Sequence, residues 1–163
     1  MNTEKLFKMQ KELDRHIESQ HGLEEENLFD RKVLALLVEI GELANETRCF
    51  KFWSVKPSSE KEIILEEFVD GIHFILSLGI ECGFDDIRSV FTAKSDGADV
   101  SIHFIEVYER VQEFRKTRSR EEFIHLFEGY MKLAELLGLE ENQIEQAYIQ
   151  KNEVNYDRQR KGY

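Results

Sequence analysis

Proline is almost absent from this chain: Pro57 is the only one in 163 residues, and the nine glycines lie mostly between apolar segments. A sheet of several strands needs turn residues at close intervals, and this sequence does not supply them. We therefore expect an all-α fold. Internal repeats, low-complexity runs and long linkers are missing too, so we expect a single domain over residues 1–163.

Cysteine is also scarce. Cys49 and Cys82 are the only two, and they form neither a metal-binding pair nor a disulfide framework. The first sixteen residues carry a charge every few positions, unlike a signal peptide, and no stretch approaches the roughly 18 apolar residues of a membrane span. The sequence therefore predicts a cytoplasmic protein with reduced thiols and no membrane partner.

Positive charge is in deficit, with 22 Lys and Arg against 33 Asp and Glu and a formal net charge of −11. Nucleic-acid polymers and anionic membranes require a basic face, so these partners are not expected. A small phosphorylated ligand held through a metal is compatible with the charge. The hydrophobic fraction of 41% excludes a disordered acidic chain, so we expect a folded core.

Apolar residues recur at steps of three and four, which is typical of amphipathic helices. In the first such segment they are Leu6, Met9, Leu13 and Ile17. The pattern predicts helices over residues 3–19, 30–47, 60–83, 99–116, 119–137 and 140–160. Together they indicate a bundle of five or six helices.

Two segments have the spacing of a capping box, in which a Ser or Thr is followed three residues later by Glu or Gln. They are Ser59 with Glu62 and Ser119 with Glu122. We expect each pair to cap the helix that follows.

The two most apolar predicted helices each contain paired acids. Within residues 33–44 only Glu39, Glu42 and Gly41 interrupt the apolar residues, which predicts a helix buried on nearly all sides. Glu39 and Glu42 are three residues apart and so share one helix face. Residues 63–80 repeat the arrangement with Glu67 and Asp70.

Buried carboxylates require a partner, because burying one unpaired costs several kcal/mol and neighbouring ones repel each other. Neither apolar stretch contains Lys or Arg, so a divalent metal is favoured, and oxygen ligands suit Mg²⁺ or Mn²⁺. We expect a four-helix core around this metal site. The alternative is that the acids simply face solvent. The proposed ligands are Glu39, Glu42, Glu67 and Asp70.

The segment from residue 151 onward is locally positive. Lys151, Asn155 and Arg158 follow one another at steps of four and three, on one helix face, and such a row can hold a polyphosphate. Cations at a helix end are also common as partners of the helix dipole. In the connection near residue 53, Phe52 and Trp53 could stack on a base or plug the core.

Several sequence blocks together resemble the dimeric all-α dUTPases, relatives of the broader all-α nucleoside triphosphate pyrophosphatases. The first block is EIGELANE, with FKFW shortly after it. The second is EEFVDGIHF, and the third is the terminal KNEVNYDRQRKGY. The resemblance covers most of the chain and is weakest over residues 96–138. It implies a homodimer that uses Mg²⁺ to hydrolyse dUTP, with dUDP as a further candidate substrate. A metal-bound water would attack the α-phosphorus to give dUMP and pyrophosphate.

The resemblance also assigns residues to roles. The four acids would hold the metal, with Glu39 and Glu42 catalytic and Glu39 favoured as the base. Lys151, Asn155 and Arg158 would bind phosphate, with Gln159 and Tyr163 completing that block. The expected nucleoside-binding residues are Gln10, Asp14, Trp53 and His73. His73 could alternatively be a hydrogen-bonded core histidine.

Three rival interpretations remain at this stage. A related pyrophosphatase would share the metal site but prefer other nucleoside triphosphates. A di-iron bundle would use E-x-x-H pairs, for which Glu18 with His21 and Glu122 with His125 have the spacing. A helical interaction module would carry its acids only for solubility.

Overall fold

A computed structural model of the chain describes residues 1–88 and 97–162. These residues form six α-helices and no strand, which confirms the all-α prediction. No helix in these two ranges is long and apolar enough to cross a membrane. The helices are α1 (Thr3–His21), α2 (Phe29–Thr47), α3 (Lys61–Glu81), α4 (Val100–Thr117), α5 (Arg120–Leu136) and α6 (Glu141–Arg160).

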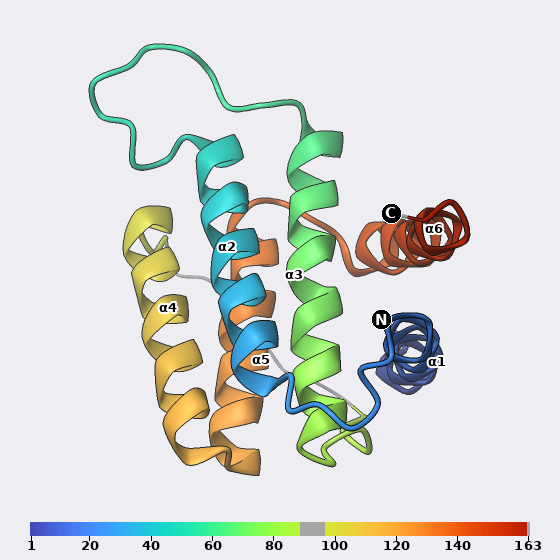
Figure 1. The fold of residues 1–163 in the computed structure, drawn as a ribbon. Coiled ribbons are helices and arrows are strands. Elements are labelled where there is room, and N and C mark those ends of the chain that lie inside the picture. Colours follow the sequence, from blue (N-terminus) through green and yellow to red (C-terminus); the bar gives the residue numbers. More distant parts are fainter. Residues whose placement is uncertain (89–96, 163) are drawn as a thin grey trace.

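Four helices, α2 to α5, stand beside one another as an upright bundle, and α1 and α6 lie across it next to α3 (Figure 1). Helix α3 is the central element, because it contacts α1, α2, α5 and α6. The first and last helices also pack against each other, although they are far apart in the sequence. One continuous apolar core joins all six helices.

The helices form where the apolar period predicts them, and every predicted boundary lies within two residues of the observed one. On α2 the buried residues follow steps of four and three, which is the period of one helix face. They are Phe29, Val33, Leu36, Ile40 and Leu43. Helix α1 ends at Gly22, whose φ of 64° is the left-handed conformation that glycine adopts at no steric cost.

Only one of the two predicted serine caps is present. The Ser119 hydroxyl accepts a hydrogen bond from the Glu122 backbone N–H at 3.2 Å and caps α5. The Ser59 prediction is wrong, because α3 begins one residue later with Glu60 at its N-cap and has no side-chain cap. The Ser59 hydroxyl donates instead to the Glu46 carboxylate on α2.

The prediction that α2 is buried on nearly all sides is also wrong. Leu34 and Val38, which share one face of this helix, are 63% and 49% exposed. Helix α3 comes closer to that description, with ten buried residues among its twenty-one. Apolar composition alone did not distinguish the two helices, because α2 packs on α3 and α4 but leaves its outer face uncovered.

Candidate active site

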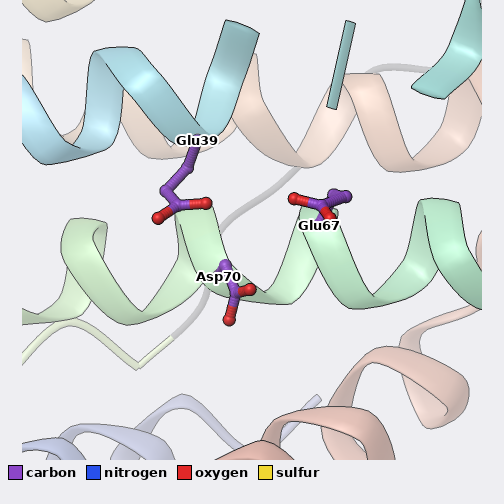
Figure 2. A group of neighbouring side chains, drawn as sticks. All are labelled: Glu39, Glu67 and Asp70. Atoms are coloured by element: carbon purple, nitrogen blue, oxygen red, sulfur yellow. The ribbon is translucent and has the colours of Figure 1, made fainter. Parts of the chain in front are cut away.

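Three acidic side chains from two helices converge. One carboxylate oxygen from each of Glu39, Glu67 and Asp70 lies within 4.8 Å of the others. Figure 2 shows the Glu39 side chain reaching from α2 towards α3, which carries Glu67 and Asp70. The cluster therefore lies at the α2–α3 contact, on the side that α6 approaches, rather than in the centre of the α2–α5 bundle.

Burial, with neighbouring negative charge, perturbs all three acids. Burial, followed by the charges of Asp70, Glu42 and Glu67, raises the pKa of Glu39 to about 7. Burial is also the main cause of the raised pKa of Glu67 and of Asp70. A cation would relieve this repulsion, and an all-oxygen donor set suits a hard divalent ion. The three residues therefore fit a divalent metal.

Glu42, the fourth predicted ligand, is exposed and lies outside the three-residue cluster. Its charge is nonetheless close enough to contribute to the raised pKa of Glu39 and Glu67. The structure thus groups three of the four predicted ligands and leaves Glu42 at the edge.

A basic side chain does reach the cluster. It comes from α6 and not from α2 or α3, the two helices that carry the acids. Lys151 on α6 donates to Asp70 at 2.7 Å and to Glu66 at 2.8 Å. Burial alone would lower the pKa of Lys151, but its hydrogen bonds to the two acids outweigh burial and raise it. The two carboxylates next to Lys151 are therefore partly neutralised without a metal.

A pocket of about 370 Å³ opens beside the cluster, between α1, α2, α3 and α6. Seven of the predicted site residues line it: Gln10, Asp14, Glu39, Asp70, His73, Asn155 and Arg158. Apolar side chains supply much of the remaining wall, including Leu23 and Leu28 from the connection between α1 and α2. A ligand in this pocket would contact the acids Glu39 and Asp70 on one side. Elsewhere it would contact apolar side chains and amide groups such as that of Gln10.

The pocket floor contains a hydrogen-bonded row of polar side chains. Gln10 donates from Nε2 to Asp14 Oδ1 at 2.7 Å, and Ser77 donates to Asp14 Oδ2 at 2.6 Å. The Gln10 Oε1 atom lies 2.7 Å from His73 Nδ1 and accepts from the Tyr148 hydroxyl at 2.7 Å. The His73 and Tyr148 rings are stacked 4.2 Å apart.

Burial sets the protonation of this row. Burial, followed by the charge of Lys151, lowers the pKa of His73 to about 3, so its imidazole is neutral near pH 7. Burial raises the pKa of Asp14, against the opposing effects of the Ser77 hydrogen bond and the Lys32 charge. His73 is therefore both a hydrogen-bonded buried histidine and a pocket residue.

Other predicted residues lie away from the pocket. Trp53 is on the connection between α2 and α3, is 65% exposed, and packs edge-on against Phe52. It neither plugs the core nor lines the pocket. Gln159 pairs with His21 at 2.9 Å, and Tyr163 lies outside the described residues.

Some pocket residues were not anticipated. Ser77 and Lys32 line the pocket, and Tyr148 supports its floor. Ser77 had a detectable signal, because it is a polar residue one helical turn after His73 in an otherwise apolar run. Lys32 had no such signal: its salt bridges with Glu18 and Glu81 join three helices.

The E-x-x-H pairs of the di-iron interpretation do not come together. Glu122 contacts His125 at 3.7 Å on α5, whereas Glu18 on α1 pairs with Lys32. Over residues 1–88 and 97–162, the one group of three or more potential ligands is the Glu39 cluster.

The fold and the pocket define an all-α protein with a ligand pocket beside an acidic cluster. A family model described as dUTPase matches residues 2–163, and the chain belongs to this family. It is accordingly an enzyme, a dUTP diphosphatase, and its substrate is a nucleotide. A comparison with curated proteins gives no match.

Proposed function

We propose that the protein hydrolyses dUTP to dUMP and pyrophosphate in a Mg²⁺-dependent reaction, with water attacking the α-phosphorus. One observation carries the proposal: a single pocket is lined by Glu39 and Asp70 of the acidic cluster and by Asn155 and Arg158 of α6. A triphosphate in this pocket would have carboxylates for its metal and donors for its oxygens within reach.

The metal would be held by Glu39, Glu67 and Asp70, with Glu42 at the edge of the cluster. Mg²⁺, or Mn²⁺ in its place, supplies Lewis-acid polarisation of the phosphate and lowers the pKa of water. The raised pKa of Glu39 and of Glu67 supports this assignment, because a bound cation would offset both the burial of their charges and the repulsion from neighbouring acids.

Glu39 is our candidate for the general base. Its carboxylate has two oxygens, so one can serve the metal while the other accepts the proton of the attacking water. A general base works best when its pKa lies near the working pH, and burial, the largest cause of the raised pKa of Glu39, persists when a metal is bound.

Lys151, Asn155 and Arg158 would bind the phosphates. They lie along α6 with Lys151 already at the acidic cluster. Without substrate the Lys151 ammonium pairs with Asp70 and Glu66, and with a triphosphate bound it would pair with phosphate oxygens. The nucleoside would occupy the part of the pocket lined by Gln10, Asp14 and His73. Trp53 is kept as a nucleoside contact on the resemblance alone.

We also propose a homodimer. Leu34 and Val38 on α2, and Ile102 and Ile105 on the neighbouring α4, are apolar residues 49–63% exposed in the single chain. Apolar side chains gathered on adjacent helices are typical of a surface that a second protein covers. Helix α2 is rich in apolar residues but is not fully buried within one chain. A second copy of the chain packed on its exposed face would explain this composition.

The activity is tested by measuring hydrolysis of dUTP with and without Mg²⁺ in heavy-oxygen water. We expect Mg²⁺-dependent formation of dUMP and pyrophosphate with the heavy oxygen in dUMP, because the oxygen of the attacking water stays on the phosphorus that it attacks. Heavy oxygen in pyrophosphate would contradict attack at the α-phosphorus, and release of dUDP and phosphate would contradict the reaction itself.

The site is tested by Glu39→Gln, which keeps the shape of the side chain and removes its charge and basicity. We expect kcat to fall by at least about 100-fold, the usual contribution of a general base. Glu113→Gln is a matched control, because Glu113 is exposed on α4 and pairs only with Lys116. Full activity of the Glu39 variant would exclude this site.

A further inference from the structure

One ring nitrogen at the pocket lacks a partner. His73 is 6% exposed and lines the pocket, and its Nε2 atom is buried with no hydrogen-bond partner among the described residues. A buried polar atom without a partner costs about 1–3 kcal/mol, so a native structure keeps one only where something else offsets the cost. A bound ligand could supply the missing partner.

The nature of that partner depends on whether Nε2 carries a proton. Asp14 determines the position of this proton, because Asp14 is hydrogen-bonded to Gln10 and Gln10 to His73. An ionised carboxylate only accepts hydrogen bonds. Gln10 must therefore turn its NH₂ group towards Asp14 Oδ1, as observed at 2.7 Å. The orientation of the Gln10 amide is thus set by Asp14, and its carbonyl oxygen faces the other way.

That carbonyl oxygen determines the state of His73. It lies 2.7 Å from His73 Nδ1, and a carbonyl oxygen cannot donate, so Nδ1 must carry the proton. A neutral imidazole has one proton, so Nε2 holds a lone pair. The Tyr148 hydroxyl, which also donates to the Gln10 oxygen, is compatible with this arrangement. The unpartnered Nε2 atom of His73 can therefore only accept a hydrogen bond, and its partner must be a donor.

We propose that Asp14, acting through Gln10, locks His73 in the Nδ1-protonated tautomer, so that Nε2 accepts a hydrogen bond from the imide N3–H of uracil and disfavours cytosine. The proposal rests on the proposed function, because it places the base of a deoxynucleotide in this pocket. Gln10 and Asp14 are positioning residues, and His73 is the residue that contacts the base.

The discrimination follows from the chemistry of the two bases. Uracil carries a proton on N3, whereas neutral cytosine has a lone pair there. Cytosine in the same position would bring two lone pairs together in a buried site, and a site built around a hydrogen bond rejects a ligand that cannot make it. The opposite tautomer of His73 would reverse this preference.

The tautomer is tested first, without substrate, by nitrogen NMR of the histidine side chains, with His73 assigned by comparison with His73→Gln. We expect the Nδ1-protonated pattern in the wild-type protein. In Gln10→Met the acceptor is lost, so the pattern should shift towards Nε2–H. Asp14→Ala frees the Gln10 amide to turn, so we expect the NMR pattern of His73 to shift in the same direction. If Gln10→Met does not fold, Asp14→Ala takes its place.

Base selection is then measured as the ratio of the Kd values of dCMP and dUMP, which needs no turnover. We expect a clear preference for dUMP in the wild type and a ratio reduced by ~10-fold in Gln10→Met. Tyr148→Phe is the matched control: it removes the other donor to the Gln10 oxygen but leaves the Asp14–Gln10–His73 chain, so its tautomer and ratio should match the wild type.

Three results would overturn the inference. The first is an Nε2–H pattern in the wild type. The second is a Kd ratio in Gln10→Met equal to that of the wild type. The third is a Kd ratio in His73→Gln equal to that of the wild type with both nucleotides bound more weakly, which would assign His73 to a group that they share, such as the deoxyribose. A protein that prefers dUMP through this network but does not hydrolyse dUTP would uphold the inference and refute the proposed reaction. The two failures are therefore distinguishable.

Discussion

At the scale of single residues, Glu39 carries the strongest electrostatic signature of the site. Its side chain is about half buried and faces Asp70, Glu42 and Glu67, which together with burial bring its pKa to about 7. Such a group destabilises the folded chain when it is ionised, because the unfolded chain holds the same charge in water. The acidic cluster should therefore lower stability when no cation is bound.

The pH dependence of unfolding tests this in metal-free buffer. Glu39 ionises near 4.5 when unfolded and near 7 when folded, so the folded protein binds its proton more tightly between these values. Its contribution to stability is present below 4.5 and is lost as pH rises through about 7. We therefore expect the Tm advantage of Glu39→Gln over the wild type to grow from about pH 5 to about pH 8.

The comparison between variants is needed because His73 acts in the opposite direction. Its pKa is lowered to about 3 from 6.5, so it adds stability as pH rises between these values, equally in both proteins. Saturating Mg²⁺ should shrink the Tm difference at the upper end of the range, since the ion binds the folded wild type. Parallel Tm curves would show that the Glu39 carboxyl is not perturbed.

At the scale of elements, α3 and α5 meet in one close contact. A Cβ atom added at Gly71 would lie 2.0 Å from the Tyr130 hydroxyl oxygen and 2.6 Å from its Cζ atom. Tyr130 is fully buried, donates to the Phe68 carbonyl at 2.9 Å and stacks on the Phe68 ring. The absence of a side chain at Gly71 therefore allows α5 to approach α3 at the residue next to Asp70.

We expect Gly71→Ala to destabilise the fold by about 1–3 kcal/mol, because the buried Tyr130 ring has no space into which it can move. Denaturant unfolding measures the change. Gly41→Ala on α2 is the matched control: its Cβ would lie 3.0 Å from the hydroxyl of the half-buried Tyr108, the far end of a side chain that can move. A loss for Gly71→Ala no larger than for the control would contradict this account of the α3–α5 contact.

The elements were largely predictable and their contacts were not. Apolar periodicity located all six helices, since the period of a helix face is written in local sequence. It could not show that Lys151 reaches Asp70 across 81 positions of the chain, so the acids of α3 looked free of cations. It also could not show that Glu42 faces solvent while Glu39, three residues earlier, faces the cluster.

The predicted pocket residues illustrate the same limit. Gln10 has little local signal, and its meeting with His73 at 2.7 Å depends on how α1 packs on α3. The resemblance to a family supplied these positions where periodicity could not. Trp53 was placed by resemblance too, and its exposed position in the single chain follows from a connection that packs few side chains against the core.

At the scale of the whole molecule, the exposed apolar faces of α2 and α4 predict self-association. We expect the wild type to sediment as a dimer at micromolar concentration and the double variant Leu34→Glu, Val38→Glu to sediment as a folded monomer, because buried charge at an interface is costly. Ile63→Glu, at an exposed apolar position on α3, is the control and should remain dimeric. A monomeric wild type would contradict the dimer.

The packing of the first helix against the last has a consequence for how the protein is made. Backbone and side-chain contacts join the two, including the Asn2 N–H to Glu145 at 2.9 Å, and both helices line the pocket. A chain emerging from the ribosome N-terminus first has Gln10, Asp14 and the acidic cluster long before Lys151 exists. Asp70 is therefore made 81 residues before Lys151, about half the length of the chain, and the pocket is completed only when α6 is released.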